Sequence, residues 1–152
     1  MRVALGAFAL SMALLVNVSV ARAFAASEKL ESAGLRALMQ RIPYGSRTVG
    51  LVFDAGSRFV RFSPYLHAVA WVQAERGGAV MFTFADFPAS PFRFRESNRP
   101  ARVPPRWEWL PARVDTERDL GFYDYVLTRS ARWPVRGFTL VQSAGSWALW
   151  SR

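Results

Sequence analysis

The chain has 152 residues, enough for one domain of ordinary size, and 51% of them are hydrophobic. It contains no cysteine and a single histidine, which excludes disulfides, thiolate nucleophiles, cysteine-based metal sites and multi-histidine metal sites within one chain. We therefore expect neither a metal nor a cofactor. The net charge of +9 favours anionic partners such as lipid headgroups, phosphorylated glycans or nucleic acid.

The N-terminal segment is long and apolar. Residues 3–21, VALGAFALSMALLVNVSVA, contain no charge and would span about 28 Å as a helix, close to the roughly 30 Å hydrocarbon core of a bilayer. Small residues at 21–25 fit a signal-peptide cleavage site, but the run is longer than the usual signal-peptide core. We favour an uncleaved anchor over residues 1–23 and an extracytoplasmic domain over 24–152; cleavage would instead give a secreted protein.

The first element of the domain is a predicted helix over residues 27–42. Ser27 suits its N-cap and Pro43 follows its end. Because this helix comes almost directly after the membrane segment, it could continue that segment and hold the domain close to the bilayer. The next element, TVGLVFD at 48–54, reads as a short buried strand.

A second helix is predicted in the stretch SPYLHAVAWVQAERGG, residues 63–78. Ser63 suits its N-cap, Pro64 its first helical position, and the two glycines at its end provide a stop. AVMFTFAD at 79–86 reads as a strand. A strand, a helix and a strand at this spacing predict a βαβ unit, in which the two strands run parallel.

The remainder combines an irregular segment with further strands. Residues 87–113 hold six prolines and six arginines, which predicts a long basic loop. YDYVLTR at 123–129 is a predicted strand, and residues 138–152 predict a hairpin that turns at SAGS. The expected fold is therefore α/β: an N-terminal membrane helix followed by a small sheet with a parallel βαβ unit and a C-terminal hairpin.

Motifs of the common catalytic machineries are missing. The first strand is followed by DAGSR, which lacks the glycines of a dinucleotide or phosphate loop, and the chain has no GxSxG elbow. Asp54 and Asp86 both fall at the carboxyl ends of proposed parallel strands, the edge at which open α/β sheets bind ligands. Such a pair could hold a sugar or a cation; the alternative is that both residues cap the turns that follow.

Three further residues are candidates for the rim of such a pocket. His67 lies near the start of the second predicted helix, where it either edges the pocket or only packs. Arg93 and Arg95 lie in the basic loop, where guanidinium groups could pair with phosphate or face an anionic membrane surface. We assign no catalytic residue, and the lack of a recognised binding motif argues against nucleic acid.

Several short motifs resemble, in this order, the C-terminal soluble region of bacterial polytopic membrane glycosyltransferases similar to dolichyl-phosphate-mannose–protein mannosyltransferases. They are GLVFDAGSRFVRFSPYLHAVAWVQAERGG, FADFPASPFRFR, PPRWEW, YDYVLTR and SAGSWALWSR. The resemblance implies an extracytoplasmic α/β domain after a last membrane helix, on the periplasmic side of the inner membrane. That family carries its catalytic acid in an early loop between membrane helices that this chain lacks, so no activity is carried over.

These observations lead to one expected function and two rivals. We expect a membrane-anchored accessory domain that contacts membrane lipid and binds or positions a glycan, a lipid-linked sugar or a polytopic membrane protein, without catalysis of its own. One rival is a free-standing periplasmic hydrolase that uses Asp54 and His67. The other is a purely structural interaction domain.

Overall fold

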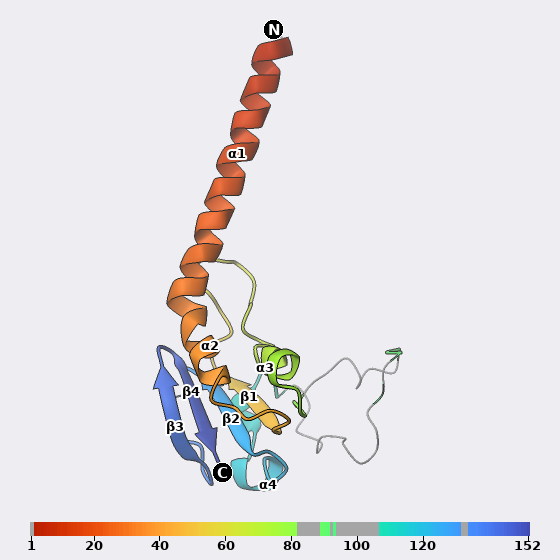
Figure 1. The fold of residues 1–152 in the computed structure, drawn as a ribbon, viewed down its shortest axis with the longest axis vertical. Helices are drawn as coiled ribbons and strands as arrows, with labels where there is room; N and C mark the ends of the chain where they lie inside the picture. Colours follow the sequence, from red (N-terminus) through yellow and green to blue (C-terminus); the bar gives the residue numbers. More distant parts are fainter. Residues whose placement is uncertain (1, 82–88, 92, 94–106, 132–133) are drawn as a thin grey trace.

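A single long helical rod forms the N-terminal part of the computed structural model, which describes residues 2–81, 89–91, 93, 107–131 and 134–152. The rod consists of α1 (Arg2–Ser27), a π-helical turn η1 (Glu28–Ser32) and α2 (Ala33–Met39). Most of α1 projects away from the domain (Figure 1), and α2 packs onto it. Within the described residues this is the one helix long and apolar enough to cross a membrane.

The rod confirms the predicted helix and its continuation from the apolar segment, but it corrects the predicted cap. Ser27 lies inside the helix with α-helical backbone angles and caps nothing. Its hydroxyl instead lies 3.1 Å from the Tyr65 hydroxyl, in the interior of the domain. A helix that does not begin at Ser27 has no free N–H groups there for a cap to satisfy.

The sheet has four strands in the order β1-β2-β4-β3. β1 runs parallel to β2, and the other neighbours are antiparallel, so the mixed α/β fold expected from the sequence is confirmed. The hairpin between β3 and β4 turns at Gly145, whose φ of 61° favours glycine. The strands are β1 (Thr48–Val52), β2 (Tyr125–Arg129), β3 (Thr139–Ala144) and β4 (Trp147–Ser151).

β1 has two parallel neighbours, the expected segment 79–86 and, in addition, β2. β1 pairs with β2 over five positions, from Thr48 opposite Tyr125 to Val52 opposite Arg129. The segment 79–86 contributes one parallel bridge, between Val80 and Thr48, on the other side of β1, and residues 82–86 lie outside the described residues. Buried strands carry apolar side chains on both faces, so their sequences do not reveal which neighbour they take.

The helix of the crossover, α3 (Val69–Arg76), is shorter than predicted. Its N-cap is Ala68, and Ser63 and Pro64 lie in preceding turns with i→i+3 hydrogen bonds, such as that from Ala68 N to Tyr65 O at 3.0 Å. The chain after Ser63 therefore makes tighter turns, and the regular helical hydrogen bonds begin only near Ala68. The helix ends as predicted, at Gly77 with φ 65°.

Two hydrophobic clusters lie on opposite faces of the sheet, because alternate side chains of a strand point to opposite faces. α2 and α3 cover one face, where Leu38, Val72 and Trp147 are buried. The other face is covered by the segment around α4 (Thr116–Asp119), with Trp107, Leu120 and Tyr123 in its core. α3 approaches β1 so closely that a Cβ on Gly50 would lie 2.8 Å from Val69.

Candidate functional site

A polar pocket opens at the carboxyl ends of the parallel strands β1 and β2. It has a volume of about 450 Å³. The helical rod forms one wall, the turn after β1 another, and the β3–β4 hairpin turn a third. The residues that line it are Leu30, Glu31, Asp54, Gly56, Ser57, Arg58, Arg129, Ser130 and Ser146.

Arg129, the last residue of β2, is the buried cation of this pocket. Its side chain is 5% exposed. The guanidinium carbon lies 4.3 Å from the centre of the Tyr65 ring and 5.7 Å from that of Trp147, so two aromatic faces stabilise the charge. Nη1 donates to the backbone oxygen of Asp54 and lies 3.3 Å from its Oδ2. Nε has no hydrogen-bond partner among the described residues.

Glu31 is the carboxylate that ties the rod to the turn after β1. Its Oε2 accepts from the Ser57 hydroxyl at 2.6 Å and the Tyr65 hydroxyl at 3.0 Å, and its Oε1 accepts from the Arg58 backbone N–H at 3.0 Å. Glu31 lies ten residues beyond the uncharged run. Burial alone would raise its pKa, but these three hydrogen bonds and the charge of Arg129 lower the pKa below its ordinary value.

The mouth of the pocket carries both hydrogen-bond donors and hydrogen-bond acceptors. Ser130 and Ser146 are exposed and are held together by a hydrogen bond from Ser130 N to Ser146 O at 2.8 Å. Ser130 has a φ of 56°, a strained value for a residue with a side chain. Hydroxyls, a carboxylate and guanidinium groups around one opening can both donate to and accept from a ligand that carries several hydroxyls.

The structure includes one of the predicted site residues in this pocket. Asp54 lines it, and the same carboxylate also caps its turn, because Oδ1 accepts from Gly56 N at 3.0 Å. His67 is exposed in the turn before α3 and is not among the residues that line the pocket. Arg93 is exposed and also does not line it, and Asp86 and Arg95 lie outside the described residues.

The residues that the sequence did not single out are Glu31, Tyr65 and Arg129. Arg129 carried a usable signal, because it is a charged residue at the carboxyl end of a predicted buried strand, YDYVLTR. That signal pointed to a site only once this strand was known to run parallel to β1. Glu31 gave no comparable signal, since an acidic residue in the first turn of a predicted helix is ordinarily explained by the helix dipole.

No metal site is evident in the part of the chain that the structure describes, where no three histidine, cysteine or acidic residues come together. The chain was also compared with known proteins. No family model matches it, and neither the curated proteins nor the solved structures include a significant match.

Proposed function

We propose that this protein is a single-pass, membrane-anchored domain on the extracytoplasmic side, and that its polar pocket binds the sugar of a glycan or of a lipid-linked sugar. The observation that supports this most directly is the buried Arg129, packed against two aromatic rings and directed at Asp54 in an open pocket edged by serine hydroxyls. In this proposal the domain positions the sugar and does not transform it.

The mixed chemistry of the pocket supports a sugar over a simple anion. A sugar hydroxyl donates to a carboxylate and accepts from a guanidinium or a serine, and the pocket supplies all three. Arg58 adds an exposed cation at the opening, suited to the phosphate of a lipid-linked sugar. The resemblance to the tails of membrane glycosyltransferases points to the same class of ligand.

The position of the pocket supports a ligand presented at the membrane. Glu31, in its wall, belongs to the same continuous helix as the apolar run, which the proposal places across the bilayer. The hydrolase alternative is weaker, because Asp54 is already engaged by Arg129 and Gly56 while His67 lies outside the lining.

Calorimetric titration of the detergent-solubilised full chain with glucose 1-phosphate and with methyl glucoside tests the pocket. The side chain of Arg58 makes none of the bonds to Glu31, which go to its backbone N–H, so Arg58→Ala should leave the fold intact. We expect saturable binding of the sugar phosphate, weakened about tenfold in Arg58→Ala, as for one lost charge-assisted hydrogen bond.

Arg113→Ala is the matched control, since Arg113 is an exposed arginine on η4 (Pro111–Arg113), outside the pocket. The proposed function would be contradicted if neither sugar showed saturable binding. It would also be contradicted if Arg58→Ala and Arg113→Ala weakened sugar-phosphate binding equally.

The anchor needs a separate test. We expect the protein to stay with the membrane fraction after alkaline washing and to retain residues 1–23. A mature chain that starts near Phe24 or Ala26 and is recovered in the soluble fraction would show that the apolar segment is a signal peptide.

A further inference from the structure

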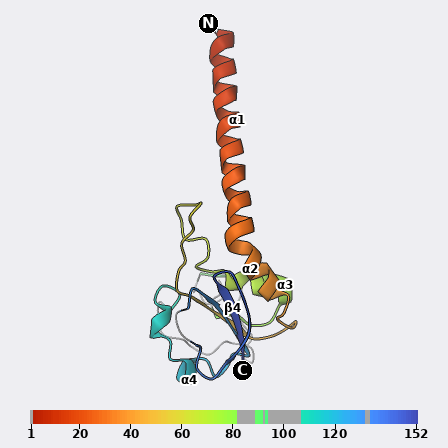
Figure 2. The same ribbon diagram turned by 90° about the vertical axis from the view of Figure 1, so that its left-hand side faces the viewer.

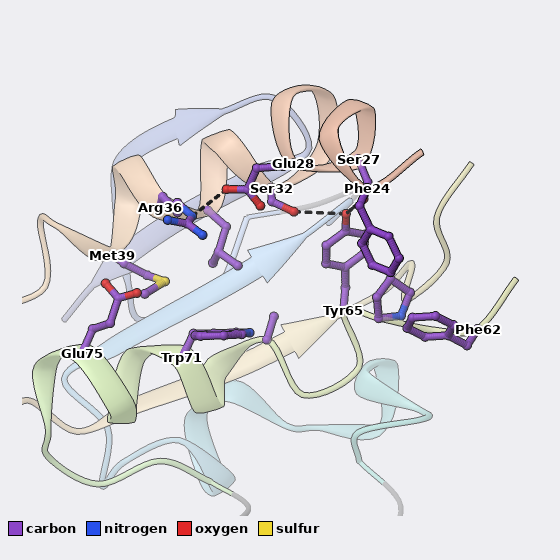
Figure 3. Close-up of a pocket in the computed structure, with 13 residues that line it drawn as sticks. Phe24, Ser27, Glu28, Ser32, Arg36, Met39, Phe62, Tyr65, Trp71 and Glu75 are labelled. Atoms are coloured by element: carbon purple, nitrogen blue, oxygen red, sulfur yellow. Dashed lines mark hydrogen bonds and ion pairs between the residues drawn. The ribbon is translucent and has the colours of Figure 1, made fainter. Parts of the chain in front are cut away.

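A second cavity, separate from the polar pocket, runs between the helical rod and α3 (Figure 3). Its volume is about 280 Å³, just below the range of about 300–1,000 Å³ typical of small-molecule sites. Most of its surface is apolar, yet charged side chains also line it. Its residues are Phe24, Ser27, Glu28, Ser32, Leu35, Arg36, Met39, Phe62, Pro64, Tyr65, Ala68, Trp71 and Glu75.

One end of this groove lies next to the apolar run. Phe24 follows the end of the run at residue 21 by three residues, which is about 4.5 Å along a helix. Phe62 belongs to the loop between β1 and α3, and in both views this loop rises on the same side of the domain as α1 (Figures 1 and 2). Phe24 and Phe62 are 54% and 61% exposed, although both are large and apolar.

The groove changes in character along its length. Phe24, Tyr65 and Phe62 gather at one end, while Arg36, Met39 and Glu75 lie at the other (Figure 3). Two hydrogen bonds show which part of the rod lies at each end of the groove. At the aromatic end, the Tyr65 hydroxyl lies against the Ser27 hydroxyl. At the charged end, Arg76, next to Glu75, donates to the backbone oxygen of Met39. The aromatic end therefore faces the membrane segment and the charged end faces away from it.

This polarity matches an amphiphile that stands in the bilayer in its normal orientation, with its chain toward the apolar run and its headgroup outward. Three charged residues line the groove: Arg36 and Glu75 lie at the outer end, and Glu28 lies between that end and the aromatic one (Figure 3). Glu28 pairs with Arg36 at 2.7 Å, and a guanidinium has enough donors to hold an additional anion. Among the residues that the structure describes, no cation pairs with Glu75.

We propose that the groove holds a phospholipid with a primary ammonium headgroup, such as phosphatidylethanolamine. The acyl chain lies between Phe24 and Phe62, the phosphate meets Arg36, and the ammonium meets Glu75 beside the face of Trp71. Trp71 and Glu75 are one helical turn apart on α3, so they share a face, and Trp71 is 61% exposed.

The charges favour this headgroup over an anionic one. Two carboxylates and one guanidinium leave the lining with a net charge of −1, so the ligand should bring a cation together with its phosphate. A choline headgroup brings a cation too, but it cannot donate hydrogen bonds to Glu75, and a glycerol headgroup brings none.

The inference depends on the proposed membrane anchoring and is independent of sugar binding. Native mass spectrometry of the detergent-solubilised full chain tests it, with equal amounts of phosphatidylethanolamine, phosphatidylcholine and phosphatidylglycerol that have identical acyl chains. We expect one bound lipid, with phosphatidylethanolamine favoured about tenfold, the factor for one charge-assisted hydrogen bond. Glu75→Gln should remove that preference, and Trp71→Ala should reduce binding of all three lipids.

Each variant has a matched control outside the groove. Glu117→Gln changes an exposed carboxylate on α4, and Trp109→Ala removes a tryptophan that is 62% exposed. Both should bind lipid like the wild type. The inference is overturned if no lipid is retained, if Glu75→Gln keeps the preference, or if a second copy of the chain occupies the groove. Loss of glucose 1-phosphate binding with lipid retention intact would remove the sugar pocket alone.

Discussion

Trp147 donates its indole N–H to the backbone oxygen of Glu31 at 2.8 Å, although 116 residues separate the two in sequence. The acceptor lies in the π-helical turn η1, and the donor begins β4. The same tryptophan ring packs edge-on against Tyr65, with the ring centres 5.6 Å apart. This bond therefore fastens the helical rod to the C-terminal hairpin at the point where the rod leaves the domain.

Trp147→Phe should destabilise the domain by about 1–3 kcal/mol, because it removes the only donor of the indole and leaves a part-buried carbonyl without this partner. Chemical denaturation of the full chain in detergent, followed by circular dichroism, measures the change. Trp109→Phe is the control; Trp109 is exposed, so its replacement should change stability by less than about 0.5 kcal/mol. Equal effects would contradict the role of the bond.

Arg129 and Asp54 form an ion pair whose two members differ greatly in burial, with side-chain exposures of 5% and 59%. Arg129→Met should lower the free energy of unfolding by about 2 kcal/mol, because it removes the two desolvated cation–π contacts that Arg129 makes. Asp54→Asn should cost at most about 1 kcal/mol, since an exposed partner contributes little. The same denaturation measurement compares them. If Asp54→Asn proved the more damaging change, stability would depend on the turn and not on the aromatic contacts.

Gly34 brings the backbone of α2 into close contact with the hairpin. A Cβ at this position would overlap the backbone oxygen of Ala144 and lie 3.0 Å from its carbonyl carbon, so the backbones must separate to admit it. Gly34→Ala should therefore destabilise the domain by about 1–3 kcal/mol, despite the better helix propensity of alanine. Gly121→Ala is the control, because a Cβ there meets nothing within 4 Å. A stabilised Gly34→Ala variant would show that the rod does not seat on the hairpin as described.

Asp124 gives the stability a component that depends on pH. It accepts from the Arg47 guanidinium at 2.5 and 3.0 Å, and these hydrogen bonds lower the pKa of Asp124 below its ordinary value of 3.8. A lowered pKa in the folded state means that the contribution is complete above the ordinary value and is lost as the pH falls through the folded-state pKa.

Asp124→Asn should therefore reduce the free energy of unfolding at pH 7, and its difference from the wild type should shrink as the pH falls from 7 past 3.8 and through the lower folded-state pKa. Denaturation curves across this range measure the difference. A gap between the two proteins that stays constant with pH would exclude ionisation of Asp124 as its cause.

Local patterns predicted much of this fold. The strands at 48–52, 125–129 and the hairpin follow from runs of apolar residues between turn residues, and the stop at Gly77 follows from the need for a positive φ. The start of α3 did not follow, because the residues after Ser63 form turns with hydrogen bonds from Leu66 N to Ser63 O and from Ala68 N to Tyr65 O in place of a first helical turn.

The candidate site was only partly predictable. Asp54 was found because the carboxyl end of a strand is a local feature of the sequence. The other residues of the site come from three separate segments: Glu31 from the rod, Tyr65 from the turns before α3, and Arg129 from β2. No local sequence pattern indicates that these segments meet.

By itself, the sequence determined where most of the helices and strands lie and that the N-terminal run is apolar, because these properties depend largely on residues close along the chain. Only the tertiary structure decided that β2 lies parallel to β1 and that Arg129 is buried against Tyr65 and Trp147. It also decided that the rod and α3 enclose a groove with one apolar and one charged end. Strand pairing and burial depend on contacts between distant residues, and the free energy of those contacts is set by the whole domain.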